Sequence, residues 1–305
     1  MQTKTVSIIV PAYNAQNTIC MCIESLLELE YPDEKPEIII IDNNSTDNTQ
    51  NLIKKYPVIY LQEVKKGPAA ARNTGIKSAN GRLIAFTDAD CVVDRYWLKN
   101  LVTGLDGPNI AGCGGDVIPF RIKTHLDKYN AKMFWPIKKI IEGELYGYPY
   151  IITANALFRK SVLQEVGYFD ESFPVAAHED TDLGWRISQK GYKLKYIPDA
   201  KIIHNHRTHI LGLYKVGFKG GYGAEILYNK HKQFTLKRPL DINIGIKRLI
   251  RYFLNLIKNS YKKDMTIFNF FDLLFQTAYF SGFVYSKIKH SYKNRAPSIF
   301  FTKLI

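Results

Sequence analysis

Cysteine is scarce in this sequence, and the few cysteines do not form a metal-binding pattern. The four are Cys20, Cys22, Cys91 and Cys113 among 305 residues, without the short paired spacing of a structural zinc site. Cys20 and Cys22 stand two residues apart in a segment that we expect to be helical, where such neighbours do not face each other. We expect free thiols that pack as small apolar side chains in a reducing compartment.

Internal repeats and low-complexity segments are also missing from the sequence, and we expect no secretory leader. Its first residues, MQTKTVSIIVPAYN, run directly into a strand-like segment and offer no long apolar region with a small-residue cleavage site. We therefore expect this part of the chain to be cytoplasmic. The 46% apolar and 23% charged residues are typical of globular proteins and argue against wholesale disorder.

Acidic residues are rare in the last third of the chain. Residues 201–305 contain 19 lysines and arginines but only four acids, whereas the first 200 residues contain 23 basic and 24 acidic residues. The net charge of +14 therefore belongs to a C-terminal region. This distribution argues against nucleic acid as a partner and favours an anionic membrane surface.

Two apolar segments, Ile246–Ile257 and Thr266–Tyr285, lie within this basic region. The second is long enough to span a bilayer, but Asp272 would place a charge inside the membrane, where it is costly. We favour amphipathic helices that lie in the membrane interface. A true span and a helical bundle packed on the N-terminal domain are the alternatives.

The first 120 residues alternate strand-like and helix-like segments. Apolar β-branched runs predict strands at Val6–Val10, Glu37–Ile41, Val58–Leu61 and Leu83–Phe86, with helices at residues 16–29 and Pro68–Ser78. Later segments predict a helix at Asp180–Gln189 and short strands at Lys193–Ile197 and Lys201–Ile203. We expect an α/β domain over residues 1–210, with a Rossmann-like, mostly parallel central sheet flanked by helices, and a helical basic extension over residues 211–305.

Sheets of this kind bind ligands beyond the carboxyl ends of their strands. Polar residues follow three of the expected strands, in the segments Ala12-Tyr13-Asn14, Asp42-Asn43-Asn44 and Asp88-Ala89-Asp90. Carboxylates at positions i and i+2 after a strand can converge on one hard divalent cation that phosphate oxygens also hold. Such a cation offsets the charge of a leaving diphosphate. Because Asp-x-Asp is common by chance, the surrounding sequence has to show whether this one is a metal site.

Six segments in a fixed order give that context. They are Ser7–Asn14, Glu37–Asp47, Gly67–Gly75, Asp88–Asp90, Gly167–Phe173 and His178–Arg186. Together they resemble family 2 glycosyltransferases of the GT-A fold over about residues 5–210. The resemblance implies an inverting enzyme that moves a sugar from a UDP- or GDP-sugar to an acceptor hydroxyl, with Mn²⁺ or Mg²⁺ as cofactor.

The resemblance also implies a set of donor-binding residues. Those lining the nucleotide base would be Pro11, Ala12, Tyr13 and Asn14. Asp42 would accept a hydrogen bond from the base or ribose, and Asn43 replaces a second acidic residue that the family often has. Arg72 would lie near the nucleotide or its phosphates, where a fixed cation is favourable.

For the metal, the resemblance favours Asp90 as a direct ligand, with Asp88 acting partly through water or the ribose and Ala89 between them. A histidine after the last expected strand would complete the site or touch the diphosphate. His204 and His206 point the same way in an extended segment, so the sequence does not choose between them. We favour His204; the alternative is that neither is a ligand.

Glu179 and Asp180 match the family's acidic pair at the start of a helix below the acceptor site. Asp180 is our candidate for the base that takes the acceptor proton. The neighbouring carboxylates of Glu179 and Asp182 would raise its affinity for that proton. The alternative is a structural role, because acids are favoured at helix N-termini in any case.

The basic apolar tail suggests a lipid-linked glycan or glycolipid as acceptor, at the cytoplasmic face of a membrane, in cell-surface glycan assembly. A Q-x-x-R-W pattern is missing, so we expect one sugar per acceptor visit. The competing hypothesis is a non-catalytic nucleotide-sugar-binding scaffold of a membrane glycan-assembly complex, against which the retained acids argue. A nucleotidyltransferase would need a glycine-rich phosphate loop where Pro11–Asn14 stand.

Overall fold

An eight-stranded mixed sheet is the centre of the α/β unit in the computed structural model, which describes residues 5–32, 35–133, 136–144, 148–205, 209–232, 242–259 and 263–293. Its strands are β1 (Val6–Ala12), β2 (Glu37–Asp42), β3 (Ile59–Gln62), β4 (Leu83–Phe86), β5 (Cys91–Val93), β6 (Ile110–Pro119), β7 (Ala156–Arg159) and β8 (Lys193–His204). The order across the sheet is β3-β2-β1-β4-β7-β6-β8-β5.

The first four strands are parallel, as expected for apolar strands joined by helices. β7 is antiparallel to both β4 and β6, and β5 is antiparallel to β8, whereas β6 and β8 run parallel. Four of the seven described pairings are therefore parallel. The predicted α/β architecture is confirmed, with antiparallel strands added on one side of β4.

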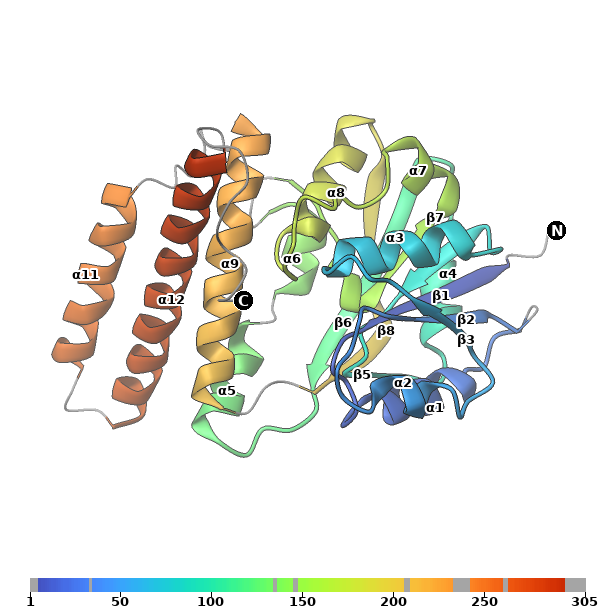
Figure 1. Ribbon diagram of the computed structural model, residues 1–305, viewed down its shortest axis with the longest axis horizontal. Helices are drawn as coiled ribbons and strands as arrows, with labels where there is room; N and C mark the ends of the chain where they lie inside the picture. Colours follow the sequence, from blue (N-terminus) through green and yellow to red (C-terminus); the bar gives the residue numbers. More distant parts are fainter. Residues whose placement is uncertain are drawn as a thin grey trace. The chain divides into compact units, whose positions relative to one another are not determined.

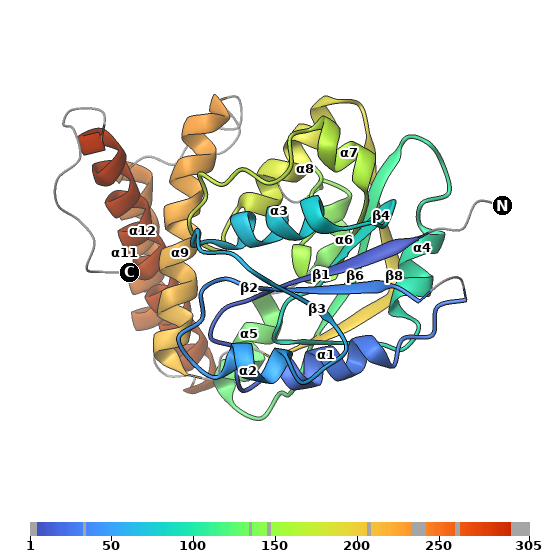
Figure 2. The ribbon, with the colours of Figure 1, turned by 45° about the vertical axis from the view of Figure 1, so that its right-hand side comes forward.

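Helices cover both faces of the sheet. They are α1 (Ile19–Leu27), α2 (Thr49–Ile53), α3 (Pro68–Ser78), α4 (Trp97–Thr103), α5 (His125–Met133), α6 (Ile137–Ile141), α7 (Lys160–Glu165) and α8 (Glu179–Gln189), with a 3₁₀ turn at Thr153–Asn155. In Figure 2, α1 and α2 lie on one side of the sheet and α3, α7 and α8 on the other.

The hydrophobic core is double because the central strand is buried on both faces. In β1, Ile8 and Val10 pack in a cluster with α1 and α4, whereas Ile9 packs in a second cluster with α3, α7 and α8. Alternate residues of a strand point to opposite faces, so one run of apolar residues supplies both layers. The continuous β-branched pattern of β1 and β2 follows from this double burial.

Two features of the α/β unit differ from the expectations. The two short strands expected at Lys193–Ile197 and Lys201–Ile203 are parts of one strand, β8. Its pairing with β6 shifts between Gly115 and Asp116, so that three residues of β8 bulge out of the ladder. The first helix begins at Ile19 rather than at residue 16.

The four cysteines are free thiols, as expected. Cys22, Cys91 and Cys113 are buried, and burial raises the pKa of each of these thiols above its ordinary value. They therefore pack as small apolar side chains.

A second compact unit is helical and comprises Val175–His178 and Arg207–Ile305, whereas the α/β unit comprises Met1–Pro174 and Glu179–His206. The helical unit contains α9 (Ile210–Lys230), α11 (Ile242–Lys258) and α12 (Lys263–Lys293). Figure 1 shows α12 between α9 and α11. Among the described helices, none combines the length and the apolar character that crossing a bilayer requires.

Glycines let α9 and α12 approach closely. A Cβ atom at Gly221 would lie 1.7 Å from the carbonyl oxygen of Tyr279, and one at Gly282 would lie 2.0 Å from that of Phe218. Any larger residue at either position would force the helices apart.

The short segment Val175–His178 packs on α9. A Cβ atom at Gly223 would lie 2.4 Å from the carbonyl oxygen of Ala177. His178 adopts a positive φ of 69°, and burial lowers the pKa of its imidazole to about 4, against a hydrogen bond with the backbone of Gly220. The chain therefore passes through the helical unit immediately before it enters α8.

Candidate active site

The carboxyl ends of β1 and β2 are held together by their loops. Asn14 Oδ1 accepts a hydrogen bond from the Thr46 backbone at 2.8 Å, and the Asn14 backbone donates to Ser45 Oγ at 2.9 Å. Asn14 and Asn44 both have positive φ, which asparagine tolerates better than most residues. Tyr13 is left 55% exposed beside this junction. An aromatic ring and polar backbone groups thus meet where the sequence predicts the nucleotide base.

Asp42 ends β2 with its side chain buried. Its Oδ1 accepts from the Ser45 backbone at 3.0 Å and its Oδ2 accepts from the Tyr60 hydroxyl at 3.3 Å. Burial and the charge of Asp42 raise the pKa of Tyr60, against a hydrogen bond from Gln50, so the phenol remains a donor. A carboxylate has about four acceptor positions, which leaves capacity for a nucleotide group.

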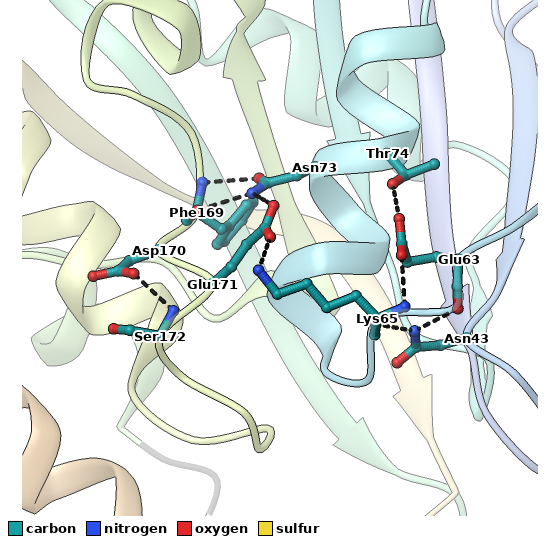
Figure 3. A network of polar contacts seen from close by, with 9 residues as sticks. All are labelled: Asn43, Glu63, Lys65, Asn73, Thr74, Phe169, Asp170, Glu171 and Ser172. Carbon is teal, nitrogen blue, oxygen red and sulfur yellow. Dashed lines mark hydrogen bonds and ion pairs between the residues drawn. The ribbon is translucent and has the colours of Figure 1, made fainter. Parts of the chain in front are cut away.

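Asn43 holds the loop between β3 and α3. Its Nδ2 donates to the carbonyl oxygens of Glu63 and Lys65 at 3.0 and 2.8 Å, and its Oδ1 accepts from the Gly67 backbone at 2.8 Å. Figure 3 shows the two carbonyl contacts. Sequence reasoning missed this positioning role, because it depends on a loop 20 to 24 residues away. The predicted donor contact of Asn43 stays a prediction.

The same loop is tied to the turn that precedes α8. Lys65 Nζ lies 2.5 Å from Glu171 Oε2, and Asn73 of α3 donates to Glu171 Oε1 at 2.8 Å and to the Phe169 carbonyl oxygen at 2.9 Å (Figure 3). Asn73 Oδ1 also accepts from the Phe169 backbone at 3.0 Å. The segments Gly67–Gly75 and Gly167–Phe173, both found as motifs, therefore contact each other.

Arg72 connects Asp88, a predicted metal residue, to Glu179, the neighbour of the predicted base. Its guanidinium lies 3.0 Å from Asp88 Oδ1 through Nη2 and 2.9 Å from Glu179 Oε1 through Nη1, and it stacks 5.6 Å from the centre of the Phe169 ring. The Arg72 and Glu179 side chains are almost fully buried. Burial alone would lower the pKa of Arg72, but the charges of Asp88 and Glu179 raise it. A permanent cation therefore lies between Asp88 and Glu179.

Asp90 and His204 lie side by side because β5 pairs with β8. Cys91 is the register partner of His204, the Asn205 backbone donates to the Asp90 carbonyl oxygen at 2.9 Å, and His204 Nε2 lies 3.5 Å from Asp90 Oδ1. The donor atoms of Asp90, Cys91 and His204 all lie within 4.8 Å of one another.

These residues fit a divalent cation. A carboxylate and an imidazole are ordinary ligands of Mn²⁺, and Asp88 adds a carboxylate that is about a third exposed to the same turn. Ala89 is buried in the core between the two acids. Cys91, directly after Asp90, was not a predicted ligand, and its buried thiol, whose pKa burial raises, packs as an apolar side chain beside the site. His206 lies outside the described residues.

Asp180 has a pKa suited to a base. Burial and then the charge of Glu179 raise the pKa of its carboxyl group to about 7, against the opposing effect of Arg72. Its Oδ1 accepts from the Thr181 backbone at 2.7 Å. Asp182, which the sequence suggested as a further influence on the pKa of Asp180, is instead fully buried in an ion pair with Arg186. Its Oδ2 accepts a hydrogen bond from Arg186 Nε at 2.8 Å and lies 2.8 Å from Nη2.

Known proteins resemble this chain in sequence. The family model described as Glycosyl transferase family 2 matches residues 7–167. Glycosyltransferase AglE of Haloferax volcanii is 29% identical over 230 residues, which cover 72% of each chain. A poly-beta-1,6-N-acetyl-D-glucosamine synthase of Staphylococcus epidermidis is 30% identical over 214 residues, or 65% of this chain, which spans only about half (49%) of that relative.

Solved structures resemble the fold. The mannosyltransferase PcManGT from Pyrobaculum calidifontis, in complex with GDP-Man and Mn²⁺, matches with a TM-score of 0.60 at 19% identity, over 98% of this chain and 77% of that one. Residues 1–349 of TarS from S. aureus match with a TM-score of 0.54 at 17% identity, over 95% and 91%. Because the family model covers more than half of the chain, the protein belongs to glycosyl transferase family 2 and has the GT-A fold.

Proposed function

We propose that the protein is an inverting, metal-dependent glycosyltransferase that moves a single sugar from a nucleoside diphosphate sugar to an acceptor hydroxyl. The carrying observation is the bridge through Arg72, which joins Asp88 on the donor side to Glu179 beside Asp180. Inverting transfer needs a base opposite the leaving diphosphate. The fixed cation keeps these two halves of the site at a defined separation.

The donor would be a UDP- or GDP-sugar. Its base and ribose would contact the junction of Pro11, Ala12, Tyr13 and Asn14 and the carboxylate of Asp42. The similar PcManGT structure contains GDP-Man and Mn²⁺, which supports a nucleotide sugar as donor. The exposed ring of Tyr13 offers a stacking surface for a base.

Asp90 and His204, with Asp88, would hold Mn²⁺ or Mg²⁺ against the diphosphate. A divalent cation supplies Lewis-acid and electrostatic stabilisation of charge on the leaving group. Arg72 is committed to Asp88 and Glu179, so it would orient these acids rather than bind the phosphates directly. This is a refinement of the role expected for Arg72.

Asp180 would remove the proton of the acceptor hydroxyl. A pKa of about 7 makes the carboxylate a stronger base than an ordinary aspartate while it remains largely ionised at slightly alkaline pH. Glu179 contributes a neighbouring charge to that pKa and is itself fixed by Arg72. The two acids therefore have different tasks.

The acceptor would be a lipid-linked glycan or glycolipid, met at the cytoplasmic face of a membrane during cell-surface glycan assembly. The basic C-terminal region supports this part of the proposal, because its cations suit anionic lipid headgroups. A lipid-linked acceptor would be concentrated at the same surface.

The test is the Asp180→Asn variant together with a donor screen. Thermal shift with manganese should find one UDP- or GDP-sugar that stabilises the wild type and the variant alike, because a ligand that binds the folded state raises the apparent stability. Transfer to an extracted lipid acceptor should fall by about 10²–10⁴-fold in the variant. Full transfer in the variant would remove Asp180 as the base.

The same screen distinguishes the scaffold hypothesis. If a nucleotide sugar binds but none is transferred or hydrolysed by the wild type, with or without lipid acceptor, the protein is a binding scaffold. If manganese changes neither donor affinity nor turnover, the proposal that transfer depends on a metal is wrong.

A further inference from the structure

One face of α11 consists of large apolar side chains exposed to solvent. The exposed residues are Ile242, Ile246, Ile250, Phe253, Leu254 and Ile257. Their spacing of three and four residues puts them on one side of the helix. The last four are each more than half exposed, and no described residue of α11 is buried. We name these six residues the α11 ridge.

Cations line one border of the ridge. Lys247, Arg251 and Lys258 are spaced by four and seven residues, so they form a second row beside the apolar one. All three are exposed. The helix sequence INIGIKRLIRYFLNLIK contains no acidic residue. An apolar row with an adjacent cationic row is the pattern of a helix that lies in a lipid interface.

The neighbouring helix α12 is different, although its sequence is the more apolar one. Phe271, Ala278 and Phe283 of α12 are buried, and a Cβ at Gly282 would meet the backbone of α9. α12 is therefore the packing core of the helical unit, between α9 and α11 (Figure 1). Of the two apolar segments of the sequence, Thr266–Tyr285 therefore lies in a helix that packs inside the unit, whereas Ile246–Ile257 lies in a helix with an exposed apolar face.

We propose that the α11 ridge inserts into the surface of an anionic membrane, with Lys247, Arg251 and Lys258 on the lipid headgroups. Charge complementarity decides the occupant. A second copy of this chain would bring the same cations against these, whereas phosphate headgroups neutralise them. The inference rests on the proposed function only in that a lipid-linked acceptor needs an enzyme at the membrane; the surface itself is read from α11 alone.

The apolar part is tested with Ile250→Gln/Phe253→Gln. Both positions are exposed, and glutamine is a good helix former, so the fold should be kept. The full-length protein is sedimented with vesicles of equimolar phosphatidylglycerol and phosphatidylcholine. The double variant should lose about tenfold or more in vesicle affinity, because two apolar side chains no longer enter the interface.

The matched control is Ile59→Gln/Tyr96→Gln, an isoleucine and an aromatic residue of similar exposure in the α/β unit. Its vesicle affinity should equal that of the wild type. Equal losses in the test and control variants would overturn the proposal, because binding would then follow overall apolarity. A wild type that does not sediment with anionic vesicles would also overturn it.

The charged part is tested with Lys247→Gln/Arg251→Gln/Lys258→Gln. This variant should bind anionic vesicles weakly and respond little to added salt, whereas the wild type should bind well at low salt and lose affinity as salt rises. The control is Lys55→Gln/Lys99→Gln/Lys128→Gln, which removes three exposed lysines of the α/β unit. Equal losses in both triple variants would mean that net charge, not α11, attracts the membrane.

Two further measurements separate this inference from the proposed function. Donor binding by thermal shift should be the same in every α11 variant, so its absence would count against the function and not against the ridge. Sedimentation velocity should find the wild type and Ile250→Gln/Phe253→Gln in the same oligomeric state. A wild-type dimer that the variant converts to monomer would identify a second copy as the occupant and overturn the membrane proposal.

Discussion

Arg72 and Glu179 form an ion pair at 2.9 Å in which the side chains are only 4% and 5% exposed. A buried pair of this kind adds little stability over apolar residues, but removing one partner leaves a charge without compensation. Arg72 also holds Asp88, so its loss affects two acids.

Arg72→Met should therefore destabilise the protein by about 3–5 kcal/mol in the free energy of unfolding, measured by denaturant titration. The double variant Arg72→Met/Glu179→Met should be less destabilised than the single one, because it leaves one fewer buried charge. Equal destabilisation of the two would mean that Glu179 is not the charge that Arg72 compensates.

The control for this prediction is Arg95→Met. Arg95 pairs with Glu30 at the surface, where both side chains are about half exposed. Its removal should change the free energy of unfolding by less than about 1 kcal/mol.

From the raised pKa of Asp180 we expect stability and the transfer rate to change in opposite directions with pH. Its pKa in the folded protein is about 7, above the ordinary value, so the folded state holds this proton more tightly than the unfolded state does. Its contribution to stability is present at acid pH and is lost as pH rises to about 7. Transfer by the proposed base needs the carboxylate, so the rate should rise as the pH passes through about 7.

The measurements are denaturation midpoints and transfer rates between about pH 5 and 8. Asp180→Asn should remove this part of the pH dependence of stability. Asp106→Asn is the control, because the hydrogen bond from Lys195 lowers the pKa of Asp106 and moves its titration below this interval. A wild-type transfer rate that is flat across pH 7 would contradict the assignment.

Asp90→Asn and His204→Asn should each weaken manganese-stimulated donor binding by about 100-fold or more, because each removes a proposed metal ligand. Donor titration with and without manganese measures this. His125→Asn, which changes an exposed histidine of α5, should leave the stimulation unchanged. Unchanged stimulation in His204→Asn alone would leave Asp90 as a ligand and exclude the histidine.

Asn43→Ala should destabilise the protein by about 1–3 kcal/mol, because the Gly67 backbone and two carbonyl groups lose their partner. Donor affinity should also fall, since the loop before α3 would no longer be held. Asn43→Asp keeps the acceptor for Gly67 but loses both donated bonds, so its loss of stability should be intermediate. Denaturant titration of the wild type, Asn43→Asp and Asn43→Ala measures the order of their free energies of unfolding.

A matched comparison is Asn100→Ala. Asn100 Nδ2 also donates to a backbone carbonyl, that of Asp199, but at an exposed position. Asn100→Ala should lower the free energy of unfolding by less than Asn43→Ala does, and it should leave donor affinity unchanged. Equal effects of the two alanine variants would show that the buried loop anchor has no special importance.

Local sequence signals were enough to predict the helices and strands whose ends are marked by neighbouring residues. The helix Pro68–Ser78 agrees with its expected bounds because Gly67, with φ of 126°, and Pro68 mark its start. The strand Leu83–Phe86 agrees because it is apolar on both faces and bounded by polar residues. The carboxyl-end rule then placed the polar segments of β1, β2 and β4 at one edge.

Long-range packing explains what the sequence did not predict. The sequence delimited no helix at Ile210–Lys230, because Gly217, Gly220, Gly221 and Gly223 are poor helix formers. Those glycines are tolerated since α12 and Ala177 occupy the space of their missing side chains. Likewise, the Arg72–Glu179 pair joins residues 107 positions apart, which a local pattern does not reveal.

The segment Val175–His178 limits how freely the two units can be exchanged between relatives. It precedes the proposed base, Asp180, in the chain yet packs against Gly223 of α9. A chimaera joined near residue 207 would keep these four residues and replace the surface that supports them. The unit that can be exchanged is therefore discontinuous in sequence. A helical unit taken from a relative would have to include that relative's own segment corresponding to Val175–His178.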